Sequence, residues 1–282
     1  MNRLFAVLTL LALATSALAG DFKGTAGLQL YSLREMMKTD LPGALDRAKA
    51  FGFTEVEGGG FIKAAPGELV AMLKERGMTL VSTHFSFKPL AENLDQCVKE
   101  AQALGVKFAV CPWIDHEIGN FGDADVQKAA AVFNRAGKAF QNAGISFGYH
   151  VHGFEFRPVA EGASETFFDR LAAATSPELV GFEMDVLWVV LPGADPVKLL
   201  EKYGSRWQLM HLKDLKKGVR TGVYTGKTEL TNDVALGTGQ VDWPAVLRTA
   251  AKVGVKHYFI EDESPTVLDQ IPASLAYLKT LN

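Results

Sequence analysis

Glycine punctuates this 282-residue chain in a repeated way. Six times a glycine opens a short run, rich in Val, Ile, Phe and Thr, that closes on a polar or ionisable residue: 52–57, 77–84, 105–111, 144–150, 204–211 and 254–261. Glycine is favoured just after a helix because it lacks the Cβ that clashes in the left-handed conformation. Runs this apolar are typical of strands buried on both faces, as in parallel sheets.

Two further runs, 26–31 and 179–185, bring the expected strands to eight. Amphipathic helices fit the gaps between them. One apolar stripe steps by four and three residues behind a predicted N-cap at Asp125, and two Asp-led, Pro-containing starts at 195–196 and 242–244 predict further helices. The stripe consists of Val126, Ala130, Phe133, Gly137 and Phe140.

Eight strands that alternate with helices predict one closed (β/α)8 barrel, the α/β TIM barrel. An open doubly wound sheet is the runner-up, but no G-x-G-x-x-G follows the first strand. No linker or low-complexity tract interrupts the chain after its first residues. We therefore expect a barrel domain over residues 20–282, preceded by a signal peptide over residues 1–19.

The signal-peptide prediction rests on three features of the first residues. Arg3 gives a positive start, residues 4–13 are apolar, and residues 17–19 form an A-x-A cleavage site. The apolar run is too short to span a membrane. We expect cleavage after Ala19, a periplasmic or otherwise secreted location, and no stable membrane anchor.

Charge and cysteine content restrict the partners. A formal charge of -3 without a basic run argues against a nucleic-acid partner. In an exported protein Cys97 and Cys111 could form a disulfide, or they could be two small buried side chains. The sequence does not determine the oligomeric state.

Ionisable residues gather where the expected strands end. The set consists of Glu57, His84, Cys111, His150, His152, Glu155, Asp185, His211 and Glu261. The chain has six histidines, and four of them are in this set. In a barrel of this class the reactive groups lie at the carboxyl ends of the strands, so these side chains would face one mouth. Oxygen and imidazole groups together suit a divalent ion such as Mn, Mg, Co or Zn.

Seven motifs carry a family resemblance over nearly the whole chain. They are GLQLYSLR (27–34), GFTEVEGGGF (52–61), YHVHGFEF (149–156), EMDVLWV (183–189), HLKD (211–214), LGTGQVDW (236–243) and YFIEDE (258–263). Their order and spacing resemble the xylose isomerase-like barrels, also called sugar phosphate isomerases/epimerases. The resemblance implies a (β/α)8 barrel, one divalent metal ion held from strands five to eight, and two carboxylates that act as an acid/base pair on a sugar.

Carried over residue by residue, the resemblance implies that Asp185, His211 and Glu261 are metal ligands. The fifth strand departs from the pattern, because His150 and His152 stand where many members have Glu. We assign Glu155 as the fourth ligand and pair it with Glu261 as the catalytic carboxylates. A further departure is Trp188, which stands where epimerases often have a substrate-binding histidine.

The remaining candidates surround this predicted metal site. His150 and His152 are expected to act as acids or bases, because imidazole titrates near neutral pH. Lys213 could stabilise an enolate. His84, Glu57 and Trp188 are further substrate-binding candidates, although His84 and Glu57 could serve structure alone. The glycine-rich connection over 216–239 has the composition of a mobile lid.

The leading hypothesis is an exported, divalent-metal-dependent sugar isomerase or epimerase that abstracts a proton next to a carbonyl of a non-phosphorylated carbohydrate. The alternative is a lyase or dehydratase that eliminates from a keto-sugar or keto-glycoside. A third reading is a non-catalytic carbohydrate-binding barrel with aromatic stacking platforms at Tyr31, Phe85, Phe87, Trp113, Phe154 and Trp188. An abasic-site endonuclease is disfavoured by the acidic charge.

Overall fold

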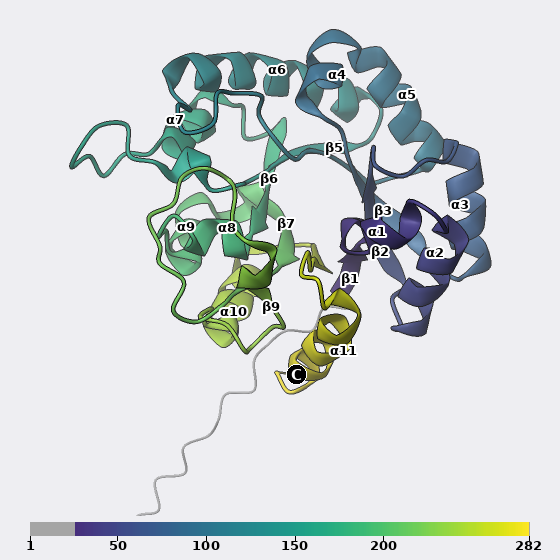
Figure 1. The fold of residues 1–282 in the computed structure, drawn as a ribbon. Coiled ribbons are helices and arrows are strands. Elements are labelled where there is room, and N and C mark those ends of the chain that lie inside the picture. The colour runs from purple at the N-terminus through teal and green to yellow at the C-terminus, as the bar shows by residue number, and fades with distance from the viewer. Residues whose placement is uncertain (1–25, 282) are drawn as a thin grey trace, which may run out of the picture.

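A computed structural model describes residues 26–281, in which eight parallel strands close into a barrel inside a ring of helices (Figure 1). The order around the barrel is β1-β10-β7-β6-β5-β4-β3-β2. This confirms the TIM barrel predicted from the repeated glycines. The predicted signal peptide lies outside the described residues. The barrel strands are β1 (Ala26–Gln29), β2 (Glu55–Gly59), β3 (Thr79–His84), β4 (Phe108–Cys111), β5 (Ser146–His150), β6 (Val180–Asp185), β7 (Trp207–Leu212) and β10 (His257–Ile260).

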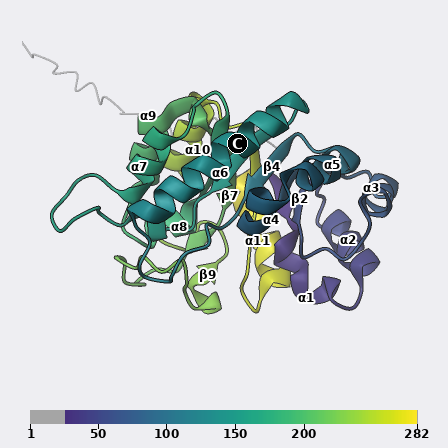
Figure 2. The ribbon, with the colours of Figure 1, turned by 90° about the horizontal axis from the view of Figure 1, so that it is seen from above.

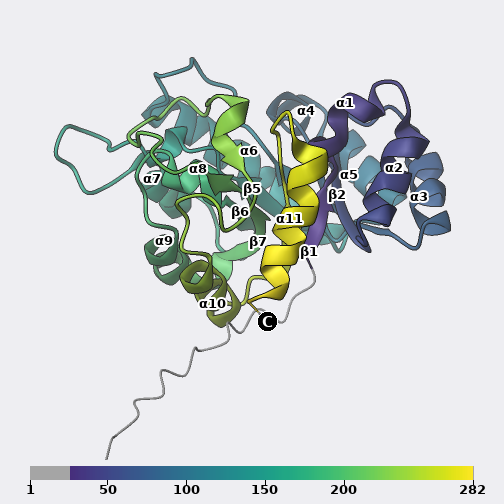
Figure 3. The ribbon, with the colours of Figure 1, turned by 60° about the horizontal axis from the view of Figure 1, so that its bottom comes forward.

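Helices cover the outside of the barrel. They are α1 (Arg34–Met37), α2 (Leu41–Ala50), α3 (Pro66–Glu75), α4 (Phe87–Glu92), α5 (Leu94–Leu104), α6 (Asp123–Asn142), α7 (Phe167–Ala174), α8 (Val186–Val190), α9 (Pro196–Tyr203), α10 (Trp243–Val253) and α11 (Val267–Lys279). Figure 3 shows α11 packed between α10 and the α1–α2 region, so the last helix closes the ring beside the first strand. Among the described residues no helix is long and apolar enough to cross a bilayer.

Helix starts follow the predicted capping chemistry with one exception. Asp195 accepts hydrogen bonds from Val197 N and Lys198 N, and Asp242 accepts one from Ala245 N, as expected of N-caps. The prediction of an N-cap at Asp125 is wrong. The long helix α6 begins at Asp123, and the Asp125 carboxylate reaches back to Gly122 N at 3.0 Å.

Side chains alternate between the two faces of each strand, so the barrel wall separates two apolar interiors. The large apolar cluster lies between strands and helices, and it contains the predicted α6 stripe of Val126, Ala130, Phe133 and Phe140. A second, small cluster consists of Val81, Phe108, Val110, Leu209 and Phe259, whose side chains fill the barrel itself. Both cysteines are buried and free, as the reading of two small packed side chains expects.

One end of the barrel carries extra structure. Strands β8 (Asp214–Leu215) and β9 (Asp233–Val234) form a two-stranded antiparallel sheet in the long connection after β7. In Figure 2, α1, α8 and β9 lie towards the same end of the molecule. This is the end at which the barrel strands finish, so the predicted site residues lie beneath it.

Candidate metal and substrate site

Side chains two residues apart along a strand share one face, and this rule builds the site. On β7, Leu209 belongs to the small apolar cluster inside the barrel, so His211 faces the same interior one step nearer the mouth. On β10, Phe259 is followed in the same way by Glu261. The barrel is therefore filled by apolar groups below and by ionisable groups above.

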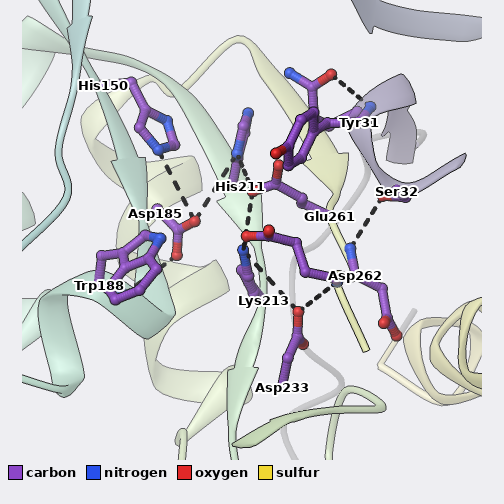
Figure 4. A network of polar contacts seen from close by, with 12 residues as sticks. Tyr31, Ser32, His150, Asp185, Trp188, His211, Lys213, Asp233, Glu261 and Asp262 are labelled. Atoms are coloured by element: carbon purple, nitrogen blue, oxygen red, sulfur yellow. Dashed lines mark hydrogen bonds and ion pairs between the residues drawn. The ribbon is translucent and has the colours of Figure 1, made fainter. Parts of the chain in front are cut away.

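Four buried side chains from neighbouring strands converge at this upper level (Figure 4). His150 Nε2 lies 4.0 Å from Asp185 Oδ2, and His211 Nδ1 lies 3.9 Å from the same oxygen. His211 Nδ1 is also 3.2 Å from Glu261 Oε2. The structure thus brings Asp185, His211 and Glu261 together, as predicted, with His150 beside them. We call these four residues the mouth cluster.

The mouth cluster has the properties of a cation site. Asp185 Oδ2 is buried and has no hydrogen-bond partner, and burial raises the pKa of Asp185 to about 7. A buried carboxylate oxygen without a partner is costly unless a cation or a proton compensates it. Single ligand atoms of Asp185, His211 and Glu261 lie within 4.8 Å of one another. Two imidazoles and two carboxylates are a donor set that suits a divalent transition metal.

Glu155 lies apart from the mouth cluster. The chain turns at Gly153, whose φ is +93°, and Glu155 then lies on the helix side of β5. Its Oε1 accepts hydrogen bonds from Tyr149 Oη (3.1 Å) and His152 N (2.9 Å), and Tyr149 packs on Phe133 of α6. The structure therefore does not bring Glu155 to the other predicted ligands or to its predicted catalytic partner Glu261. The fifth-strand side chain that lies beside the other predicted ligands is His150.

A deeper layer supports the histidines of the mouth cluster. His211 Nε2 lies 2.6 Å from Glu57 Oε1, and His150 Nδ1 lies 3.0 Å from Glu183 Oε2. His84 Nε2 contacts both carboxylates, at 3.0 and 3.1 Å. Burial opposes the charge on His84, but Glu57 and Glu183 outweigh it and raise the pKa of His84 to about 10.

Lys213 places a buried ammonium at the mouth. It is buried, and Nζ contacts Glu261 Oε2 at 3.2 Å and Glu263 Oε1, with Asp233 Oδ2 at 4.0 Å. Burial opposes its charge, but Glu261 and Glu263 hold the pKa of Lys213 well above its ordinary value. Since an ammonium has three donors, one N–H remains for a ligand.

A cavity of about 590 Å³ opens above these groups, within the range of about 300–1,000 Å³ usual for small-molecule sites. His84, His150, His152, Lys213, Trp188 and Glu261 line it, as do Tyr31, Phe61 and Trp113. Of the residues predicted to bind substrate, Glu57 is fully buried below the cavity and does not line it. Phe85, Phe87 and Phe154 belong to the core instead of forming stacking platforms.

The imidazole of His152 forms part of the cavity wall. Its ring lies between two indoles, with centroid distances of 5.1 Å to Trp113 and 5.2 Å to Trp188. Burial, His150 and Lys213 lower the pKa of His152 well below its ordinary value, so the ring is neutral. His116 and His257, the two histidines outside the set at the strand ends, do not line the cavity.

The connection over 216–239, predicted to be a mobile lid, packs against the mouth through part of its length. Gly222 N and Val223 N donate to Leu191 O, and Val223 lies against the cluster that contains Trp188. A Cβ at Gly226 would lie 2.8 Å from the Trp113 ring. Residues 226–230 thus form one wall of the cavity.

Three acidic residues of the site were not predicted from the sequence. Glu183 precedes Asp185 by two residues and Glu263 follows Glu261 by two, so the period of two along a strand could have found both. Asp233 reaches Lys213 from the long connection, and no local pattern marks it.

Comparisons with known proteins agree with this geometry. The family model described as xylose isomerase-like TIM barrel matches residues 45–281. An inosose dehydratase from Bacillus cereus (strain AH820) is 30% identical over 154 residues, which are 49% of this chain and 50% of the relative. The chain thus matches about half the length of the curated relatives that head the comparison.

Solved structures show the same fold. A sugar phosphate isomerase/epimerase from Parabacteroides distasonis ATCC 8503 superimposes with a TM-score of 0.74 at 25% identity, covering 95% of this chain and 96% of that one. The IOLI protein with a bound zinc atom shares the fold, with a TM-score of 0.65 at 13% identity over 88% and 95% of the two chains. The resemblance predicted from the motifs is confirmed: this chain belongs to the xylose isomerase-like TIM barrel family of enzymes.

Proposed function

We propose that this chain is a metal-dependent lyase that eliminates water, or another oxygen-linked group, from a keto-sugar. His150, Asp185, His211 and Glu261 would hold one divalent ion, and two imidazoles among the donors favour Mn, Co or Zn over Mg. The unpartnered Asp185 Oδ2 supports this assignment. The relatives named inosose dehydratase support elimination as the reaction class.

One observation favours elimination over the isomerase or epimerase that leads from the sequence. Three of the cavity carboxylates, Glu261, Glu263 and Asp233, gather around Lys213, whereas β5 and the residues just after it contribute the imidazoles of His150 and His152. Epimerisation requires a base on each face of the sugar. This mouth instead offers the neutral imidazole of His152 and the ammonium of Lys213, which has a free donor. One acid/base group and one enolate donor suit elimination.

Each residue of the site then has its own role in the proposed elimination. A bound divalent ion would polarise the carbonyl and acidify the neighbouring C–H. His152 removes that proton, and the free N–H of Lys213 donates a hydrogen bond to the enolate oxygen. The electron pair forms a C=C bond as the β C–O bond breaks, and His152 returns its proton to the departing oxygen. The products are an unsaturated ketone and water.

Product mass tests this proposal. The mature protein, loaded with Mn²⁺, would be incubated with an inosose and with keto-hexoses, and the products analysed by mass spectrometry. We expect a product lighter by one water, and His152→Asn should lower its rate by about 10²–10⁴. His257→Asn, at the other end of the barrel, is the matched control. A product of equal mass would favour the isomerase, and tight binding without turnover would favour the binding barrel.

We also propose export to the periplasm or the exterior. The proposal rests on the signal pattern of residues 1–19. N-terminal sequencing of the protein recovered from a secreting host should begin at Gly20. A retained Met1 would contradict export.

A further inference from the structure

We infer that Glu57 and Glu183 are positioning residues that orient the two histidines of the mouth cluster toward Asp185. This inference rests on the metal site of the proposed function. It assigns roles to two carboxylates beneath that site, one of which, Glu57, was expected to bind substrate.

The hydrogen bond that each imidazole makes to a carboxylate supports the inference. His150 offers Nδ1 to Glu183 Oε2 at 3.0 Å, so its Nε2 is the nitrogen that faces Asp185 Oδ2 at 4.0 Å. His211 offers Nε2 to Glu57 Oε1 at 2.6 Å, so its Nδ1 faces the same oxygen at 3.9 Å. The two rings use opposite nitrogens, and each choice is fixed by the carboxylate behind the ring. A carboxylate that accepts the remaining N–H fixes the tautomer and makes the imidazole a stronger ligand.

His84 holds the two carboxylates in place. Its Nε2 bridges Glu57 Oε1 and Glu183 Oε2, and its ring stacks on that of His211 at 5.8 Å with an interplanar angle of 15°. Gln29 Nε2 donates a further hydrogen bond to Glu57 Oε1 at 2.7 Å. Both carboxylates are fully buried, so neither exchanges its partners with water.

A second cation in this deeper layer is the competing interpretation. Ligand atoms of His84, His150, Glu183 and His211 do lie within 4.8 Å of one another. However, Nε2 of His84, Nδ1 of His150 and Nε2 of His211 already face carboxylates at hydrogen-bond distance, and an ion on those nitrogens would have to displace these bonds. The contacts favour support of one ion over binding of two.

Zinc affinity measured by chelator competition tests the inference on the folded protein without any turnover. We expect Glu57→Gln and Glu183→Gln each to bind one equivalent of zinc with affinity lowered by about 10–100-fold. Glu55→Gln is the matched control, because Glu55 lies on the same strand and bonds His257 at 2.9 Å, at the other end of the barrel. Should a Gln variant fail to fold, Glu57→Asp or Glu183→Asp withdraws the carboxylate while keeping its charge, and the same loss is expected.

Imidazole ¹⁵N shifts of the zinc-loaded protein supply a second readout. The metal-bound nitrogens should be Nε2 of His150 and Nδ1 of His211, and Glu183→Gln should perturb His150 more than His211. Unchanged affinity in both variants, an equal loss in Glu55→Gln, or two equivalents of zinc in the wild type would overturn the positioning role. A wild type that binds no zinc would instead refute the metal site of the proposed function.

Discussion

Glu155 makes the stability of this barrel depend on pH in a way that can be calculated. Its carboxyl group is fully buried, its Oε2 has no partner, and burial raises its pKa from 4.5 to about 7. The folded state therefore holds a proton that the unfolded state releases, and stability falls as pH rises through this window. Integrating the two pKa values between about pH 5 and about pH 8 gives a loss of about 2.5 kcal/mol.

The substitution Glu155→Gln removes this term while keeping an acceptor for Tyr149 and His152. Urea unfolding with chelator present would compare the two proteins across that pH range. With a slope of about 2–3 kcal/mol/M, the wild-type midpoint should fall by about 1 M more than that of the variant. Glu161→Gln, at an exposed position, should behave as wild type. Parallel midpoints for wild type and Glu155→Gln would refute a protonated buried Glu155.

Two further outcomes follow from contacts at the mouth. Lys213→Met should lower kcat/KM for the proposed elimination by about 10²–10³, because an enolate donor is lost. Lys227→Met, on the cavity wall, should cost less than about tenfold, and equal losses would remove Lys213 from the chemistry. Gly153→Ala should destabilise the fold by about 3 kcal/mol or more in urea titrations, because its Cβ would lie 2.6 Å from Trp188 O at a φ of +93°. Gly162→Ala, with φ +75° and open space, should cost about 1–2 kcal/mol, and a similar cost at Gly153 would contradict the clash.

The fold was predictable because its causes are local. Gly77, Gly105, Gly144 and Gly254 adopt positive φ before buried strands, as their residue type demands. The mouth residues Asp185, His211 and Glu261 were predictable for a related reason. Strand ends converge in a closed barrel, and the period of two decides which side chains enter it.

The course of the chain after β5 was not predictable in the same way. After His152 the period of two no longer applies, because Gly153 turns the backbone. The family pattern has a carboxylate ligand from the fifth strand, and Glu155 was assigned to this role because it follows the paired histidines His150 and His152. Three-dimensional packing on Tyr149 places it elsewhere. The approach of Asp233 to Lys213 depends likewise on the path of a long connection.

Metal content after dialysis against a chelator of micromolar affinity tests the central claim most directly. Wild type and Glu155→Gln should each retain close to one equivalent of divalent metal by elemental analysis, and His150→Ala should lose it. This result would place the fifth-strand ligand at His150, as the geometry indicates. Retention by His150→Ala with loss from Glu155→Gln would contradict the site described above. Absence of metal from all three proteins after reconstitution with Mn, Co or Zn would contradict the metal-dependent lyase itself.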